Sequence, residues 1–431
     1  MIYENLSVSP EGHLLFSGYD TLELAKKYGT ALYVMDETRI RQRCREYKKA
    51  MADFLPAGSR PLYASKALSI KRIYQIMAEE NMGVDVVSSG ELYTAVKAGF
   101  PMENAYFHGS SKTDDDIRFA MEHQIGFIVC DNADELDAID AEAGRQGICQ
   151  KILLRLAPGV DPHTHEKINT GRVDSKFGVA IETGQAAKLV GTALSKKNID
   201  LWGYHCHVGS QLFGAELFCD SATNMLKFVA DMQKQYGHTA KVVNLGGGMG
   251  VPYTKDQCAI DYAGNIQKVG AHIQALCQQL QIAPPAILME PGRSIVADSG
   301  ITLYTVTGIK EIPGFKNYVG IDGGMSDNPR YTLYQSPYTV YNAGKMNHAA
   351  DFVCTVAGRC CESGDLIQEK VELARPVRGD ILAVLTTGAY NYSMASNYNR
   401  IPRPPVVMIG ENGPYVAVRR ETYDDLLLCD Q

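Results

Sequence analysis

Short apolar runs alternate with amphipathic stretches through most of the chain, starting at about residue 60. The runs are four to seven residues long and rich in β-branched or aromatic side chains, which is typical of buried strands. The stretches between them, such as IKRIYQIMAEE and DDDIRFAMEHQ, carry apolar residues at helical spacing. The pattern predicts eight strands separated by helices, at residues 61–65, 83–87, 104–108, 126–130, 151–156, 201–207, 241–245 and 286–290.

Eight strands with helical connections are the number that closes a (β/α)8 barrel, a fold that often exceeds about 200 residues as one domain. A doubly wound open sheet is the competing architecture, because its strands and helices alternate in the same way. We expect the barrel, and we assign residues 31–297 to it.

The pattern changes after about residue 297. Apolar and polar positions then alternate in several segments, from ITLYTVTGIKEI at 301–312 to PYVAVRR at 414–420, with Gly or Pro between the segments. Such alternation predicts antiparallel strands joined by tight turns. We therefore expect an antiparallel β-barrel or sandwich domain at residues 298–431. The opening segment SPEGHLLFSG is hairpin-like, which suggests that residues 1–30 join this second domain.

Composition narrows the class of protein. The 431 residues include 42 Lys+Arg and 49 Asp+Glu, a net charge of −7 without basic blocks, which argues against a nucleic-acid partner. No run approaches the ~18 apolar residues of a membrane span, and MIYENLSVSPEG lacks the order of a signal peptide. The 11 cysteines form no CxxC pair, which favours reduced thiols in the cytoplasm. We expect a cytoplasmic enzyme without a membrane or nucleic-acid partner.

Polar side chains follow each predicted strand. In a (β/α)8 barrel the carboxyl ends of the strands form the face that carries the active site. A single residue of this kind has an ordinary explanation, since a lysine can be a solvated loop residue and an aspartate can cap the next helix. We expect Asp131 to be such a cap and leave it outside the site. The other strand-end residues are Lys66, Asp85, His108, Arg155, His205 with His207, Asn244 and Glu290.

The segment NLGGGMG, residues 244–250, directly follows the predicted seventh strand. Adjacent glycines allow backbone N–H groups to approach an anion closely and surround it. A flexible turn is the alternative interpretation. The loops after strands seven and eight of such barrels commonly bind phosphate, and this position favours a phosphate site.

Two HxH pairs offer a different chemistry. His205 and His207 lie on one face of a predicted strand, and His163 with His165 forms a second pair. Histidines at this spacing can bind a metal ion, so a metal-dependent barrel hydrolase is an alternative from another reaction class. However, no convincing third and fourth ligands accompany the pairs, and a histidine ring can equally stack on an aromatic cofactor. We expect no metal site.

One cofactor uses all of these groups together. The amine of Lys66 can form a Schiff base, and the glycine loop can hold a phosphate. Glu290, in the segment EPGRS, can keep a heteroaromatic nitrogen protonated because an opposite charge favours the charged form. These are the groups that pyridoxal 5′-phosphate requires of a protein, and we expect it as the cofactor.

At these residues the sequence resembles the fold-type III pyridoxal-phosphate-dependent decarboxylases, from about residue 25 to about residue 410. The segments HTHEKINTG, DSKFG and RYTLY resemble more narrowly the branch that acts on diaminopimelate. The other specific stretches are YASKA, DVVSSGELYTAVKAGF, FHGSSKT, HCHVGSQ, NLGGGMG, EPGRSIV, CCESGD and GAYNYSMASNYN.

The resemblance implies an alanine racemase-like barrel with a carboxy-lyase activity. The reaction would convert meso-2,6-diaminopimelate to L-lysine and CO2 by Schiff-base and quinonoid chemistry, as the last step of lysine biosynthesis. A decarboxylase of ornithine or arginine is the near alternative. Those substrates have no distal carboxylate, so they would not need the arginine pair Arg293 and Arg330.

The resemblance also implies roles for individual residues. Lys66 and Cys361 would be catalytic: the lysine would carry the cofactor, and the thiol would protonate the carbanion after CO2 leaves. Glu290 would pair with the ring nitrogen, His207 would stack on the ring, and Glu362 would contact the distal ammonium. The cofactor would be bound by Lys66, Asp85, His207, Ser210, Gly248, Glu290, Pro291, Gly292, Arg293 and Tyr390, and the substrate by Arg293, Arg330, Tyr334, Glu362 and Tyr390.

Finally, the resemblance implies a homodimer with shared active sites. Cys361 and Glu362 would come from the partner subunit. Lys176 and Asp365 would form an ion pair across the same interface.

Overall fold

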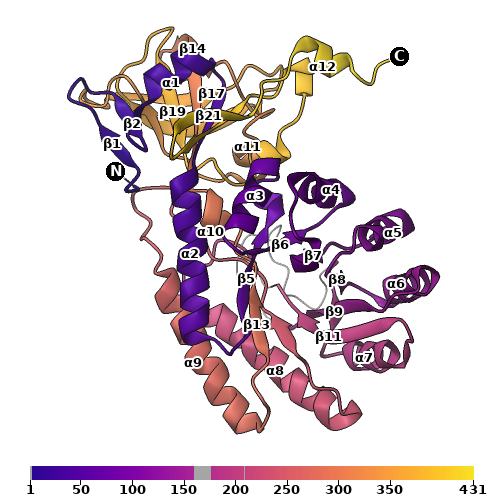
Figure 1. The fold of residues 1–431 in the computed structure, drawn as a ribbon. Helices are drawn as coiled ribbons and strands as arrows, with labels where there is room; N and C mark the ends of the chain where they lie inside the picture. Colours follow the sequence, from indigo (N-terminus) through magenta and orange to yellow (C-terminus); the bar gives the residue numbers. More distant parts are fainter. Residues whose placement is uncertain (1, 160–175, 208) are drawn as a thin grey trace. The chain divides into compact units, whose positions relative to one another are not determined.

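The computed structural model describes residues 2–159, 176–207 and 209–431, which form two compact units (Figure 1). The barrel unit consists of Arg43–Gly250 and Ile260–Ser294. The sheet unit consists of Met1–Gln42, Val251–Ala259 and Ile295–Gln431. Among the described residues, none of the helices is both long and apolar enough to cross a membrane.

Eight parallel strands of the barrel unit close into a ring, as the sequence pattern predicted. Closure is complete because β13 pairs with β5 at one junction and β8 pairs with β9 at another. A doubly wound open sheet is excluded by these pairings. The strands in ring order are β5 (Arg60–Ala64), β6 (Gly83–Val86), β7 (Ala105–Phe107), β8 (Phe127–Cys130), β9 (Gln150–Ala157), β11 (Ile199–His205), β12 (Val242–Asn244) and β13 (Ala286–Met289).

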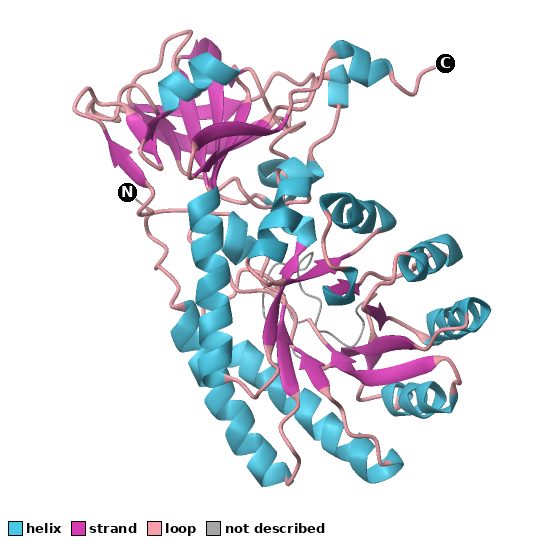
Figure 2. Cartoon of the chain, viewed as in Figure 1, coloured by secondary structure: helices cyan, strands magenta, loops and turns pink. Residues whose placement is uncertain are grey.

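Helices lie outside this ring, and all of them except the first, α2, connect its strands (Figure 2). The expected cap role of Asp131 is wrong: the side chain of Asn132 caps α6, and Asp131 instead accepts a hydrogen bond of 2.9 Å from the backbone N–H of Gly178. The short strand β10 (Val179–Ala180) pairs with β9. The helices are α2 (Glu37–Phe54), α3 (Lys71–Glu79), α4 (Ser89–Ala98), α5 (Asp114–Glu122), α6 (Ala133–Gln146), α7 (Gln185–Ser195), α8 (Glu216–Tyr236) and α9 (Tyr262–Leu280).

The barrel interior is filled with side chains, so it is a packed core and not a pore. Leu62, Leu153 and Leu288 are buried there, and the rings of Tyr106 and Phe127 stack with their centroids 4.4 Å apart. Because apolar residues fill the interior, the polar residues collect at the ends of the strands, where the chain leaves the ring.

The sheet unit contains a nine-stranded sheet in the order β18-β17-β15-β14-β4-β20-β21, with β19 paired to both β14 and β16. Most pairs are antiparallel as expected, but β15 with β17 and β4 with β20 are parallel, so the sheet is mixed. The strands are β4 (Leu32–Asp36), β14 (Gly300–Ile312), β15 (Lys316–Ile321), β16 (Val340–Asn342), β17 (Phe352–Ala357), β18 (Leu366–Leu373), β19 (Ile381–Leu385), β20 (Val406–Gly410) and β21 (Gly413–Val418).

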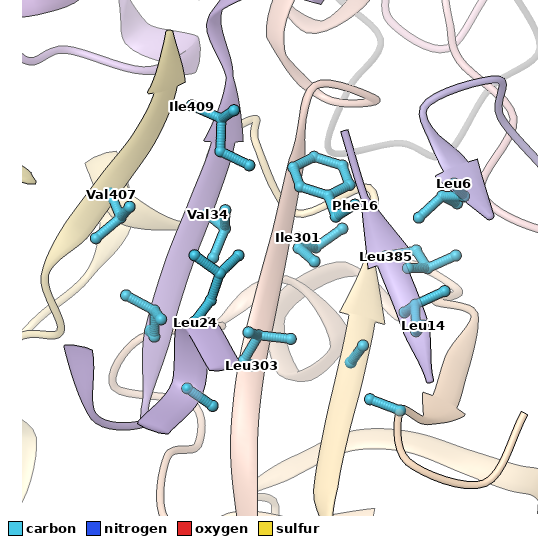
Figure 3. Close-up of a cluster of buried hydrophobic side chains, with 14 residues drawn as sticks. Leu6, Leu14, Phe16, Leu24, Val34, Ile301, Leu303, Leu385, Val407 and Ile409 are labelled. Atoms are coloured by element: carbon cyan, nitrogen blue, oxygen red, sulfur yellow. The ribbon is translucent and has the colours of Figure 1, made fainter. Parts of the chain in front are cut away.

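The chain's opening segment also lies in the sheet unit. It forms a small sheet of β1 (Leu6–Val8), β2 (Leu14–Phe16) and β3 (Tyr19–Asp20), followed by α1 (Thr21–Tyr28). Figure 3 shows Leu14 and Phe16 near Ile301 and Leu385 in one buried cluster. Three short helices complete the unit, and they are α10 (Arg293–Val296), α11 (Arg330–Tyr334) and α12 (Tyr423–Leu427), of which α10 begins in the barrel unit.

The strand β4 lies in the sheet unit, although the sequence pattern assigned residues 31–297 to the barrel. It pairs antiparallel with β14 and parallel with β20, in the middle of the second sheet. Its five residues, LYVMD, are all buried. A fully buried strand has the same apolar sequence in either domain, so only its long-range pairing shows where it belongs.

Candidate active site

Buried polar residues from six strands of the ring lie at the carboxyl end of the barrel. These side chains lie at positions where the sequence pattern places strand ends, and each of them is less than 9% exposed. They are Asp85 of β6, His108 after β7, Arg155 of β9, His205 of β11, Asn244 of β12 and Glu290 after β13.

Three of these side chains converge on one oxygen of Glu290. The amide nitrogen of Asn244 donates to Oε1 over 2.6 Å, and Nε2 of His108 and of His205 lie 3.0 and 3.3 Å from the same atom. The two imidazole rings meet edge to face, with centroids 4.7 Å apart. Among the described residues, none donates a hydrogen bond to Oε2. One oxygen of Glu290 is therefore held by the barrel, and the other is available to a ligand.

Burial and charge set the protonation of this cluster. Burial alone would raise the pKa of Glu290, but the contacts with His108 and His205 outweigh it and hold the pKa well below its ordinary value. Burial lowers the pKa of His205 to about 3, against the attraction of Glu290. Burial also raises the pKa of Asp85 to about 6. The barrel thus presents an ionised Glu290 beside a neutral His205.

The neutral state of His205 predicts a pH dependence of stability. Between its ordinary pKa of 6.5 and its folded pKa of about 3, the unfolded chain binds a proton that the folded chain does not. The free energy of unfolding should therefore fall as the pH is lowered through this window. His205→Gln should reduce this loss between pH 7 and pH 5, measured by urea unfolding of the ligand-free protein at a series of pH values.

A matched control is His348→Gln, which removes an exposed histidine of the sheet unit and should leave the pH dependence as in the original chain. An unchanged pH dependence in His205→Gln would contradict the assignment of a neutral imidazole.

Lys66 follows β5 directly, in the 3-10 turn Ser65–Ala67, and its side chain is exposed. A side-chain hydrogen bond fixes this turn to α4: the buried Ser65 hydroxyl donates to the carboxylate of Glu91 over 2.8 Å. Since β5 lies between β13 and β6 in the ring, Lys66 emerges between the strands that carry Glu290 and Asp85. Burial lowers the pKa of His207, and the positive charge of Lys66 lowers it further.

The glycine run after β12 packs against backbone on both sides. A Cβ at Gly247 would lie 2.2 Å from the carbonyl oxygen of Glu290, and one at Gly248 would lie 2.6 Å from that of Gly209. Gly248 also has a φ of +124°, which L side chains rarely adopt. Only glycine fits this close approach of the loops after β11, β12 and β13.

The predicted phosphate residues lie at these loops. Nη2 of Arg293 donates to the hydroxyl of Ser210 over 3.0 Å, which joins the loop after β13 to the loop after β11. A Cβ at Gly292 would lie 3.0 Å from Ala64, at the end of β5 next to Lys66. These residues fit pyridoxal phosphate. Lys66 offers an amine for its aldehyde, the glycine run 246–248 offers a site for its phosphate, and Glu290 offers a carboxylate for its ring nitrogen.

The remaining predicted residues belong to the sheet unit. The guanidinium carbon of Arg330 lies 4.8 Å from the ring centroid of Tyr334 and 5.0 Å from that of Tyr390, so the fold brings 330–334 and 388–399 together. Cys361 and Glu362 lie on the loop between β17 and β18, where both are exposed.

Some predicted features fall elsewhere. The pair His163 and His165 lies outside the described residues. Lys176 is exposed, and its ammonium lies 4.6 Å from the ring centroid of Phe177. The predicted site omitted His108, His205 and Asn244, although their position at strand ends was a signal that could have included them.

The cluster also bears on the metal alternative. One ligand atom each from His108, His205 and Glu290 lie within 4.8 Å of one another, a geometry that could hold a metal ion. These are not the HxH pairs of the sequence hypothesis, because His207 is not in the set. The side-chain geometry alone therefore allows two chemistries, and comparison with known proteins separates them.

The family model described as "Pyridoxal-dependent decarboxylase, pyridoxal binding domain" matches residues 37–297. The diaminopimelate decarboxylase of Bacillus subtilis is 44% identical, over 97% of this chain and 95% of its own length. That of Staphylococcus aureus is 40% identical, over 97% of this chain and 98% of its own. The chain belongs to the diaminopimelate decarboxylase family.

Solved structures agree with this membership. The crystal structure of diaminopimelate decarboxylase from M. jannaschii in co-complex with L-lysine has a TM-score of 0.91 and 34% identity, covering 99% of this chain and 98% of that chain. As in the rest of the diaminopimelate decarboxylase family, the cofactor is pyridoxal phosphate, which the barrel residues fit. The metal-dependent hydrolase is therefore not the function of the cluster around Glu290.

Proposed function

We propose that this chain is a diaminopimelate decarboxylase that converts meso-2,6-diaminopimelate to L-lysine and CO2. The observation that carries the proposal is the placement of Lys66 and an ionised Glu290 at the ends of the paired strands β5 and β13. The similarity to diaminopimelate decarboxylases extends over both units, which supports the same substrate.

Bound pyridoxal phosphate supplies an aldehyde that takes up the substrate amine and a ring that withdraws electrons from the α-carbon. The chain's residues prepare this chemistry. Lys66 would hold the aldehyde, and Oε2 of Glu290 would keep the ring nitrogen protonated. Gly248, Pro291, Gly292 and Arg293 with Ser210 would bind the phosphate, His207 would contact the ring, and Asp85 would support the cofactor.

Arg330 selects the substrate in this proposal. Arg330 is 7% exposed, and its guanidinium lies against two tyrosine rings, which hold its planar fork in one orientation. A fork of this kind binds a carboxylate through two parallel hydrogen bonds. It would neutralise the distal carboxylate of diaminopimelate, a group that ornithine and arginine lack. This residue therefore favours diaminopimelate over the substrates of related decarboxylases.

Arg330→Lys should raise KM for meso-diaminopimelate by roughly 10- to 100-fold, since a hydrogen bond to a charged group contributes about 1.5–3 kcal/mol. Lysine keeps the charge but loses both the fork and the contact with the rings of Tyr334 and Tyr390. Steady-state kinetics of the cofactor-loaded enzyme measures the change. Arg378→Lys, at an exposed arginine of the same unit, should leave KM unchanged. Equal KM values for both variants would contradict the role of Arg330.

The proposal includes a cytoplasmic homodimer in which Cys361 and Glu362 complete the partner subunit's site. Their exposure on a loop supports this, because both can reach another chain. Asp365 does not support the suggested pair with Lys176. Its carboxylate is 2% exposed and accepts backbone hydrogen bonds from Met325 and Cys360 within its own chain. We therefore leave this ion pair out of the proposed interface.

Mixing two inactive variants tests the shared site. Lys66→Ala and Cys361→Ala homodimers each lack one essential group at both sites. If the sites are shared, a mixed dimer has one site with both changes and one intact site, so random exchange should recover about a quarter of the original activity. No recovery after verified subunit exchange would show that Cys361 serves its own chain's site.

A substrate panel tests the activity itself. The cofactor-loaded enzyme is incubated with meso-diaminopimelate, L,L-diaminopimelate, ornithine and arginine while CO2 and L-lysine are followed. We expect both products from the meso isomer alone. Release of CO2 from ornithine or arginine, or from the L,L isomer as readily as from the meso isomer, would contradict the proposal.

A further inference from the structure

The loop that carries Cys361 is anchored at its base by Asp365. This carboxylate accepts hydrogen bonds from the backbone N–H of Cys360 over 2.7 Å and of Met325 over 2.6 Å. The backbone carbonyl of Asp365 also accepts from the N–H of Gly358 over 2.9 Å, so the two ends of the loop are joined. The base of the loop is therefore fixed within the sheet unit.

The tip of the loop has a different anchor. The backbone N–H of Cys361 donates to Oδ1 of Asn399 over 2.7 Å. The next N–H, that of Glu362, turns back to the carbonyl of Cys360 over 2.8 Å, a contact within the tip itself. Since Cys361, Glu362 and Ser363 are exposed, packing does not hold the tip. Asn399 is thus the side chain that holds the backbone at Cys361 itself. Further along the loop, the N–H of Asp365 donates to the carbonyl of Glu362 over 3.1 Å, and the hydroxyl of Thr332 donates to the carbonyl of Gly364 over 3.0 Å.

The backbone of Asn399 is itself held in an uncommon conformation. Its φ is +53°, in the left-handed region, which asparagine tolerates better than most residues. The turn is supported by Asn397, whose amide donates to Glu421 over 2.6 Å and to the carbonyl of Ile401 over 3.1 Å. These contacts fix the position of Asn399, whose Oδ1 accepts from the N–H of Cys361.

We propose that Asn399 is a positioning residue for Cys361. By accepting the Cys361 N–H it fixes the backbone at that residue, and hence the direction in which the thiol leaves the chain. The inference rests on the proposed function, in which the Cys361 thiol delivers a proton to the α-carbon after CO2 leaves. Without this hydrogen bond the thiol would reach the proton-accepting atom less often, so proton delivery would slow.

Two substitutions separate the side chain from its backbone conformation. Asn399→Gly removes the acceptor but keeps the left-handed φ without strain, and Asn399→Asp keeps an oxygen acceptor and tolerates the same φ. In Asn399→Gly, kcat should fall about 10-fold, the effect of losing a hydrogen bond of about 1.4 kcal/mol. Asn399→Asp should restore kcat to within about threefold.

Amide hydrogen exchange of the full-length protein gives a readout that needs no activity. The N–H of Cys361 should exchange about 10-fold faster in Asn399→Gly than in the original chain, and exchange should slow again in Asn399→Asp. The N–H of Cys360, held by Asp365, should exchange at the same rate in all three proteins.

The outcomes separate this inference from the proposed function. If the original chain releases CO2 from meso-diaminopimelate but Asn399→Gly has the same kcat, the positioning role is wrong and the function stands. Equal losses in Asn399→Gly and Asn399→Asp would also overturn it, because the acceptor would then be irrelevant. If the original chain releases no CO2, or if Cys361→Ala keeps full kcat, the proposed role of the thiol fails and the positioning role fails with it.

Discussion

Lys66→Ala is expected to lower kcat on the order of 10³-fold or more, the largest effect of any single change in the barrel. In the proposed function the amine of Lys66 would hold the cofactor's aldehyde, and alanine offers no group that can do so. The side chain is exposed at the end of β5, so its removal leaves no cavity in the packed interior. The variant should therefore fold as the original chain does while losing both activity and the visible absorbance of the lysine-bound cofactor.

The matched control is Lys71→Ala, at an exposed lysine on the first residue of α3, five residues further along the chain. It should keep full kcat and the same absorbance. Turnover of Lys66→Ala at the rate of the original chain, or an unchanged spectrum after cofactor addition, would show that another amine carries the cofactor.

Glu290→Gln is expected to lower kcat by roughly 10²-fold or more, the effect of removing a charge that a buried site directs at a developing charge. Glutamine has nearly the same shape, and its amide oxygen can still accept from Asn244. What is lost is the negative charge beside the ring nitrogen. In the original chain the pKa of Glu290 lies well below its ordinary value, so the carboxylate stays ionised throughout the neutral range. In the variant the ring nitrogen should lose its proton at a lower pH.

Absorbance of the bound cofactor against pH measures this change directly, and steady-state kinetics measures its effect on turnover. Glu135→Gln provides a matched control, because Glu135 is a buried carboxylate of the same unit that binds Lys112 over 2.7 Å and takes no part in the site. It should reduce stability but keep kcat and the spectrum. A Glu290→Gln enzyme with the original spectrum and kcat would refute the pairing with the ring nitrogen.

Many features of this protein follow from local sequence. Each barrel strand is a short apolar run that buries both faces, and this requirement leaves a pattern of four to seven residues that is visible without any knowledge of its partners. Lys66 and Glu290 were predicted as candidate site residues from the same pattern, since a charged residue directly after such a run lies at the carboxyl end of a strand. The glycine run after β12 is equally local, because a close approach of backbones excludes side chains at those positions.

Other features depend on residues far apart in the chain. β4 and a barrel strand are equally apolar, and only pairing with β14 and β20 places β4 in the second sheet. Asp131 lies next to a helix start in the sequence, yet its hydrogen bond to Gly178 crosses 47 residues. The carboxylate of Asp365, which suggested an ion pair with Lys176, is turned inward by hydrogen bonds from two loops of its own unit.

The sequence by itself predicted the barrel, the cofactor and the family, because periodicity and short motifs are local consequences of burial and of cofactor chemistry. Only the pairing of β13 with β5 and of β8 with β9 showed that the ring closes. Tertiary structure alone decided which oxygen of Glu290 is held and which is free. Asn244, His108 and His205 lie on three different strands, and they reach Oε1 only because the ring closes with a particular register. Side-chain direction within a closed barrel is set by long-range pairing, and no local pattern records it.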